Sequence, residues 1–236
     1  MSRVLVVTAI DVEARGLARH LGLTRVAGTT DLRYQGPGLD LACAGPRARH
    51  LARFTDLART ASLVVSAGTC GALAPDLVEG DLVVPERVVT RQGRPLILPR
   101  APGLSAAGTL LSVDRVAATA DAKAQLRQEI AALAVDMESA LIVAWVQSLG
   151  RPVVVVRAVS DPAHRGVPAT LVDLVDEHGR TRLGRAVQAV LVRPRTLPHA
   201  LRLRRGTSAA LRSVASAVRT LTALQGHASP HGGATP

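Results

Sequence analysis

The stretch Val153–His164, VVVVRAVSDPAH, contains the clearest strand in the chain. Four consecutive valines are β-branched and apolar, which is typical of a strand buried on both faces. The run carries Arg157 and ends in Ser160 and Asp161, and Pro162 prevents a regular helical continuation. Because a carboxylate at the tip of a buried strand is costly to desolvate, the sequence predicts a partner or ligand for Asp161.

Apolar runs of the same kind recur along the chain and alternate with helical patterns. Buried strands are predicted at 3–10, 39–45, 61–68, 80–90 and 109–113, and a short strand that runs into an apolar helix at 132–150. Helices are predicted at 11–23, 46–59 and 121–130, a Gly-rich turn at 69–77 and a loop at 91–108. This alternation predicts an α/β domain with a largely parallel sheet.

Composition and charge divide the chain into a near-neutral body and a basic end. Of a formal net charge of +11, ten charges come from arginines after His178, where no Asp or Glu occurs. We therefore expect a domain at 1–190, a basic helical extension at 191–225, with short helical segments separated around RRGTS, and a disordered tail at 226–236. Aromatic residues make up only 1% of the chain, which argues against the stacking platforms of nucleic-acid binding.

Neither cysteines nor apolar segments point to a metal site or a membrane span. Cys43 and Cys70 lack metal-ligand spacing, so buried reduced thiols are expected. No window approaches the roughly 18 apolar residues of a spanning helix. We expect a soluble cytoplasmic protein without a bound metal or resident cofactor.

Four places could carry chemistry, and each has an ordinary structural alternative. Glu13 follows a predicted strand, but it could be a first-turn acid that stabilises its helix. SAGTCGALAP at 66–75 could bring its backbone close to a ligand or form a plain turn. Glu138 precedes an apolar helix, where its carboxylate could accept hydrogen bonds from two sugar hydroxyls or could be an N-terminal acid favoured by the helix dipole. Asp161 could be a general acid, or it could start an Asp-Pro turn.

In order and spacing, these places resemble the family of nucleoside phosphorylases and methylthioadenosine/S-adenosylhomocysteine nucleosidases. The segments SAGTCGALAPDLVEGDLVVPE, AVDMESALI and VVVVRAVSDPA carry the resemblance, which covers most of 4–162. It implies a three-layer α/β/α sandwich around a mixed, largely parallel sheet, in an oligomer such as a homodimer. It also implies an enzyme that cleaves the N-glycosidic bond of a nucleoside.

The resemblance assigns roles to individual residues. Asp161 corresponds to the acid that protonates the departing purine at N7, and Glu13 to the acid that activates water. Glu138 corresponds to the acid that holds the ribose hydroxyls, and Arg157 is expected to orient nearby carboxylates. Further substrate-binding positions are Met137, Asp136, Gly68, Thr69, Cys70, Gly71 and Ser160.

A narrower resemblance links the chain to hopanoid-associated phosphorylases. It rests on LLSVDRVAATADAKAQL, VDMES and the basic Leu/Arg-rich end, and it implies release of adenine from adenosylhopane, a lipid-linked substrate. The basic segment would then contact the inner face of the membrane, although a helix that packs on the body is the alternative. The segment LRQEIAALAVDMES contains no aromatic residue to stack on the base, which departs from the nucleosidases.

The nucleophile and the substrate remain open at this point. Arg15 and Arg47 are candidates for binding inorganic phosphate as a co-substrate, so phosphorolysis and hydrolysis both stay possible. The alternative substrates are methylthioadenosine and S-adenosylhomocysteine. A catalytically inactive basic binding protein is the alternative of a different class, but the near-neutral body counts against nucleic acid as a partner.

Overall fold

The architecture is a mixed sheet with helices on both faces, and it confirms the expected α/β/α sandwich. The computed structural model describes residues 3–166 and 197–227. The strands are β1 (Val4–Thr8), β2 (Thr24–Arg25), β3 (Arg33–Gly36), β4 (Leu39–Cys43), β5 (Leu63–Ala72), β6 (Leu82–Val83), β7 (Arg87–Val89), β8 (Leu96–Ile97), β9 (Thr109–Ser112), β10 (Ala134–Asp136) and β11 (Val153–Asp161). The helices are α1 (Asp11–Leu21), α2 (Thr55–Thr60), α3 (Ala120–Ile130), α4 (Ser139–Ser148) and α7 (Leu197–His227).

The long strand β5 is the centre of the sheet. The strand order is β2-β3-β4-β1-β5-β10-β9-β7-β8, with β11 on the other edge of β5 and β6 beside β11. β1 and β11 run parallel to β5, whereas β10 runs antiparallel to it. The sheet is therefore mixed, and two strands of opposite direction share one edge of β5.

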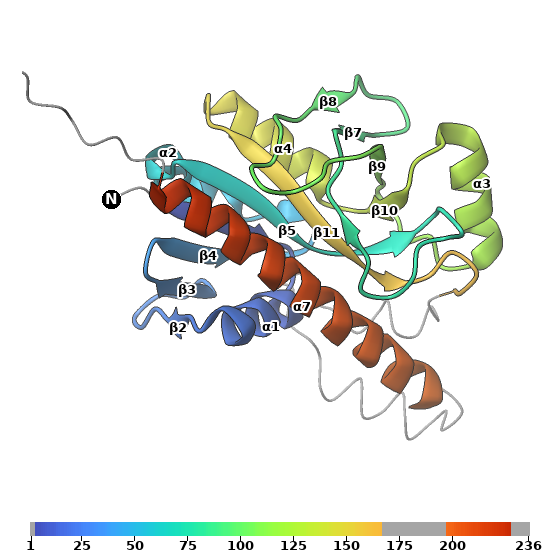
Figure 1. Cartoon of the computed structure of the whole chain (residues 1–236), viewed down its shortest axis with the longest axis horizontal. Coiled ribbons are helices and arrows are strands. Elements are labelled where there is room, and N and C mark those ends of the chain that lie inside the picture. Colours follow the sequence, from blue (N-terminus) through green and yellow to red (C-terminus); the bar gives the residue numbers. More distant parts are fainter. Residues whose placement is uncertain (1–2, 167–196, 228–236) are drawn as a thin grey trace, which may run out of the picture.

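Alternating side chains of the strands build two separate cores, one on each face of the sheet. Val153, Val155 and Val159 pack with α4 and with the α2 region, while Val154, Val156 and Ala158 pack with α1 and α7. A strand buried on both faces needs apolar residues at every position, which explains the continuous valine run of β11. Figure 1 shows the axis of α7 nearly aligned with β11, with α1 beside the middle of α7.

The strand β5 contains glycines and continues into the region where the sequence predicts a turn. Gly68 and Gly71 both lie inside β5, because the strand continues to Ala72. A Cβ at Gly68 would lie 2.3 Å from Arg157 Nη1 and 2.6 Å from Glu13 Oε1. These glycines therefore leave space for neighbouring side chains, and the expected turn at 69–77 was wrong in its first part.

Three other elements differ from their expected form. The segment from Pro46 contains two 3₁₀ turns, η1 (Pro46–Ala48) and η2 (Leu51–Phe54), before α2, because Arg47 and Ala48 have positive φ angles. The antiparallel pair β2–β3 was not expected, and β8 lies within the predicted loop at 91–108.

Within residues 197–227, the basic end of the chain forms one continuous helix rather than short segments. α7 runs through RRGTS, and Leu211, Val214 and Val218 are buried on its inner face. The expected boundary at 190/191 and the tail residues 228–236 lie outside the described residues. No described helix is long and apolar enough to cross a membrane.

Gly206 permits the close packing of α7 against the end of β11. A Cβ at this position would lie 2.2 Å from the carbonyl oxygen of Ser160. We expect Gly206→Ala to lower the free energy of unfolding by about 1–3 kcal/mol, because the backbone of β11 or α7 would have to shift. Urea denaturation measures this loss. Gly226→Ala is the matched control on the same helix, since nothing lies within 4 Å of its Cβ. Equal stability of the two variants would contradict the prediction.

Candidate active site

The site forms where β1 and β10 approach the same edge of β5 from opposite ends. Pairing of β1 with β5 ends at Ser66, and pairing of β10 with β5 begins at Gly71. The residues between them, Ala67–Cys70, have no strand partner on this edge, and we call them the open edge. The acidic residues that follow β1 and β10 therefore meet at the open edge.

Glu13 binds directly to the open edge from the first turn of α1. Its Oε1 accepts hydrogen bonds from the backbone N–H of Thr69 at 2.7 Å and from Thr69 Oγ1 at 3.0 Å. Its Oε2 accepts a longer hydrogen bond from the N–H of Ala9, at 3.3 Å. Glu13 is only 4% exposed, so it is a fixed, buried carboxyl group and not an ordinary surface acid of a helix.

Arg157 forms the charged centre of the site below the open edge. Its guanidinium forms an ion pair with Asp136 Oδ2 at 2.9 Å and donates hydrogen bonds to the hydroxyls of Ser66 and Ser139. Burial alone would lower the pKa of Arg157, but Asp136, Glu13 and Glu138 outweigh it and raise the pKa above its ordinary value. Arg157 therefore stays charged and holds the acidic residues in place.

Asp136 forms this ion pair with one of its two carboxylate oxygens, Oδ2. Asp136 Oδ2 also accepts a hydrogen bond from the N–H of Ser139 at 3.0 Å, at the start of α4. Asp136 Oδ1 is buried and has no hydrogen-bond partner among the described residues. Met137, which follows, is half-buried between Asp136 and Glu138.

Glu138 lies at the junction of β10 and α4. Its Oε1 accepts a hydrogen bond from the backbone N–H of Arg47 at 3.1 Å. Arg47 holds a left-handed conformation with φ of 54°, which is strained for a side chain other than glycine. Burial, together with the charges of Asp136 and Glu13, raises the pKa of Glu138 from 4.5 to about 7.

The raised pKa of Glu138 predicts a specific pH dependence of stability. The folded protein binds this proton more tightly than the unfolded chain, so wild-type stability should fall as pH rises from 4.5 to about 7. Glu138→Gln removes the ionisation, so we expect it to gain about 1–3 kcal/mol on wild type between pH 5 and pH 8. Urea denaturation of both proteins at the two pH values tests this. A stability difference that does not change with pH would contradict it.

Asp161 is the last residue of β11 and is 8% exposed. Ser160 Oγ donates a hydrogen bond to Asp161 Oδ1 at 2.7 Å, and Lys123 Nζ lies 2.5 Å from Asp161 Oδ2. A Cβ at Gly71 would lie 3.1 Å from the same Oδ2. Asp161 thus lies against the Gly71 end of the open edge and is held at both oxygens.

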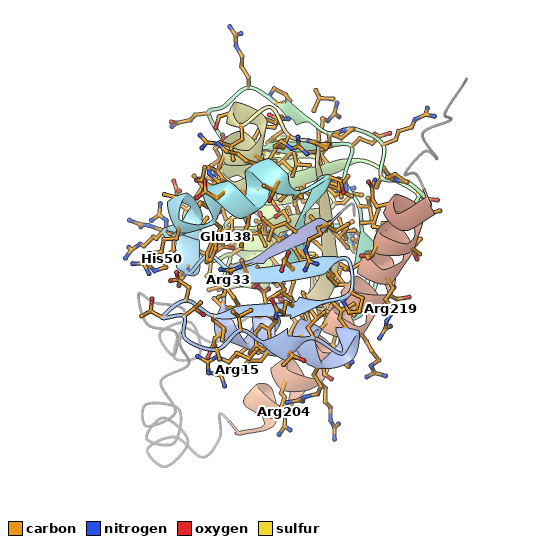
Figure 2. The ribbon with its side chains drawn as sticks, turned by 90° about the vertical axis from the view of Figure 1, so that its left-hand side faces the viewer. Arg15, Arg33, His50, Glu138, Arg204 and Arg219 are labelled. Carbon is orange, nitrogen blue, oxygen red and sulfur yellow. The ribbon has the colours of Figure 1, made fainter. Side chains whose placement is uncertain are left out.

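Two predicted residues take positions that differ from the rest. The thiol of Cys70 is buried in the core on the α4 face of the sheet, where burial raises its pKa. Only the backbone carbonyl oxygen of Cys70 contacts a site residue, because it accepts a hydrogen bond from Ser160 Oγ. Arg15 is 60% exposed and pairs with Asp11 at 3.6 Å. Figure 2 places Arg15 on α1, apart from Glu138. Arg47, by contrast, borders Glu138 and forms an ion pair with Asp114.

Lys123 was missed, although the sequence contains a signal for it. Lys123 is the single lysine among 29 basic residues, all the others being arginine. It lies three residues before the buried Leu126, hence on the inner face of α3. The single lysine of a chain that otherwise uses arginine is therefore a signal that position 123 differs from the other basic positions.

The site residues do not form a metal centre. No group of three or more His, Cys, Asp or Glu side chains with metal-binding geometry occurs among residues 3–166 and 197–227. The carboxyl groups of Glu13 and Asp161 are instead engaged by Thr69, Ala9, Ser160 and Lys123. The arrangement is therefore one of separate, individually held carboxyl groups.

Comparisons with known proteins identify the fold and a family segment. A model of the phosphorylase superfamily matches residues 100–192. No curated protein sequence matches significantly. A futalosine hydrolase mutant of Helicobacter pylori is 15% identical, with a TM-score of 0.68 over 95% of this chain and 100% of that chain. An Arabidopsis thaliana 5′-methylthioadenosine nucleosidase is 17% identical, with a TM-score of 0.66 over 99% and 98%.

A third structure shows the same relationship with a ligand present. S-adenosylhomocysteine nucleosidase from Streptococcus pyogenes, in complex with 5-methylthiotubericidin, is 18% identical, with a TM-score of 0.66 over 95% of this chain and 97% of that chain. At these identities the three structures establish a shared fold over nearly the whole length.

Proposed function

We propose that the chain is a member of the phosphorylase superfamily, whose model matches residues 100–192, and that it hydrolyses the N-glycosidic bond between adenine and a 5′-substituted ribose. One observation carries this proposal: Glu13, Glu138 and Asp161 come from three different strand ends and meet along the open edge and its Gly71 end. Each carboxyl group has different partners, so each can hold a different protonation state and a different role.

Cleavage of this bond requires charge to be handled at two places. When the C1′–N9 bond breaks, its electron pair goes to the purine and the ribose becomes cationic. Asp161 gives a proton to N7 of the purine, so the base leaves as a neutral molecule. The oxygen of water bonds to C1′, and Glu13 accepts the proton that this water loses. The carboxyl group of Glu138 binds the ribose hydroxyls, and its ionised form, which predominates above about pH 7, stabilises the developing cation.

The charges around the open edge support water rather than phosphate as the nucleophile. Three carboxyl groups, those of Glu13, Asp136 and Glu138, surround this region. The buried cation beside them, Arg157, is already paired with Asp136. A phosphate dianion would meet uncompensated negative charge here, while a neutral water molecule would not. The related structures named as hydrolase and nucleosidases agree with this choice.

Within this reaction we propose adenosylhopane as the substrate. The proposal rests on the resemblance to hopanoid-associated phosphorylases and on the arginines exposed along α7, Arg204, Arg205, Arg212 and Arg219, two of which are labelled in Figure 2. The apolar face of α7 packs on the sheet, so among the described side chains of this helix these arginines would attract an anionic bilayer. Methylthioadenosine and S-adenosylhomocysteine are the alternative substrates.

Adenine release with and without inorganic phosphate tests the reaction type. The purified enzyme is incubated with adenosylhopane in vesicles, methylthioadenosine or S-adenosylhomocysteine, and free adenine and the sugar product are measured. We expect phosphate-independent release and a free reducing sugar, with adenosylhopane preferred. Release that requires phosphate and yields a sugar 1-phosphate would overturn hydrolysis, and preference for a small substrate would overturn the lipid assignment.

A further inference from the structure

Apart from Arg157, Lys123 is the most deeply buried charged group among the described residues that the proposed reaction does not use. It lies on α3 and is 1% exposed. Its Nζ lies 2.5 Å from Asp161 Oδ2, 2.9 Å from the carbonyl oxygen of Pro162 and 3.0 Å from that of Arg165. A fourth acceptor, the carbonyl oxygen of Asp161, is 3.3 Å away.

These contacts saturate the ammonium group and leave it no donor to spare. An ammonium has three N–H donors and no acceptor, and here all its neighbours are acceptors in the segment 161–165. Burying a lysine is costly, and a lysine on a helix can usually extend to solvent instead. The three short contacts therefore fix Asp161 Oδ2 and the chain that follows β11 at the same time.

The other oxygen of Asp161 has a partner of a different kind. Ser160 Oγ lies 2.7 Å from Asp161 Oδ1 and 3.2 Å from the carbonyl oxygen of Cys70. A hydroxyl has one hydrogen, so it can donate to only one of these two acceptors. When Asp161 is ionised, Ser160 donates to Oδ1. When Asp161 is protonated at Oδ1, the acid can donate to Ser160, and Ser160 can donate to Cys70.

We propose that Lys123 is a positioning residue for protonation of the leaving base. It keeps Oδ2 occupied in both states, and so confines the exchangeable proton of Asp161 to Oδ1. This inference rests on the proposed function, because it assigns Lys123 to the acid that protonates the purine. Lysine suits the position because its compact ammonium reaches four converging acceptors, whereas a planar guanidinium would present a rigid fork.

The substitution Lys123→Met removes the ammonium and keeps the length of the side chain. Two substrates with the same 5-methylthioribosyl group are compared. The first is 5′-methylthioadenosine, and the second is a 4-nitrophenyl 5-methylthioriboside, whose leaving group needs no proton. We expect Lys123→Met to lower kcat for the nucleoside by about 10²-fold or more. It should leave the nitrophenyl reaction near the wild-type rate. In an Asp161→Asn background, Lys123→Met should add little further loss with the nucleoside, because both changes affect one proton transfer.

A matched control and opposite outcomes make the test decisive. Arg127→Met removes another cation of α3, one whose partners are the carbonyls of Ala131 and Ala132, and it should leave the ratio of the two rates unchanged. An equal decrease in kcat with both substrates would show a merely structural role and overturn the inference. It would also be overturned if the loss in kcat of the double variant equalled the product of the losses of the two single variants. Failure of the wild type to release base from any nucleoside would instead overturn the proposed function.

A measurement on the resting protein tests the contact without turnover. Because the sequence has one lysine, lysine labelled with ¹⁵N at Nζ gives a single side-chain signal. We expect Asp161→Asn to shift this signal, and Glu138→Gln, which alters a carboxyl group that does not contact Lys123, to leave it in place. A signal at the position of a solvent-exposed lysine, insensitive to Asp161→Asn, would contradict the inference.

Discussion

Replacing Asp161 with Asn is expected to lower kcat for adenine release by about 10²–10⁴-fold, the usual contribution of a general acid. Asparagine has nearly the same shape but no acidic proton to give to the purine. Its amide oxygen can still accept from Lys123, and its amide nitrogen can donate to Ser160, so the end of β11 should stay in place. The loss should therefore appear in kcat rather than in KM.

The control for Asp161→Asn is Asp56→Asn, the same change at an exposed acid of α2. Asp56 is 99% exposed and pairs only weakly with Arg59, at 3.8 Å. Steady-state adenine release by the two variants and wild type gives the comparison. If Asp161→Asn kept the wild-type kcat, Asp161 would not be the acid, and the proposed mechanism would fail.

Replacing Arg157 with Met is expected to lower the free energy of unfolding by about 3–5 kcal/mol. The change leaves the buried carboxylate of Asp136 without its cation, and it leaves the hydroxyls of Ser66 and Ser139 without their shared donor. An uncompensated buried charge is much more costly than a lost surface ion pair. Urea denaturation with a two-state fit measures the loss.

Two further variants separate the charge effect from lost packing. Arg59→Met removes an arginine that is 64% exposed and should change stability by less than about 0.5 kcal/mol. Adding Asp136→Asn to Arg157→Met removes the orphaned charge and should restore part of the loss. A loss below about 1 kcal/mol for Arg157→Met alone would mean that the ion pair contributes little to the fold.

The buried strands of the sheet could be predicted from the sequence because burial on both faces leaves a simple signal. β1, β5 and β11 each contain a run of β-branched or small apolar residues, and the glycine after Leu21 marks the end of α1. The pair β2–β3 gave no such signal, since its residues are mostly polar and half-exposed. Gly206 indicated a break in a helix, although its tertiary role is to let α7 approach Ser160.

The acids of the site could be predicted, but their arrangement could not. Glu13, Glu138 and Asp161 stand at predicted strand ends, which is where ligands bind in open α/β sheets. Which strands meet depends on the antiparallel entry of β10, and no local pattern encodes that pairing. The sequence predicted a turn from Thr69, so the side of the sheet that Cys70 faces could not be predicted. Strand alternation gives that side only because β5 continues through Gly71. Lys123 stands out as the single lysine of the chain, but its burial could not be predicted because a lysine in a helix normally faces solvent.

The packing of α7 on β11 has a consequence for the order in which the protein matures. Ribosomes complete β1, β5 and β11 before they make α7, which covers one face of β11 with Leu211, Val214 and Val218. Until α7 docks, the strand that carries Arg157 and Asp161 has one apolar face exposed to water. The docking of α7 thus closes the core beneath the strand that carries Arg157 and Asp161, so we expect a nascent chain to complete this site only after α7 has been made.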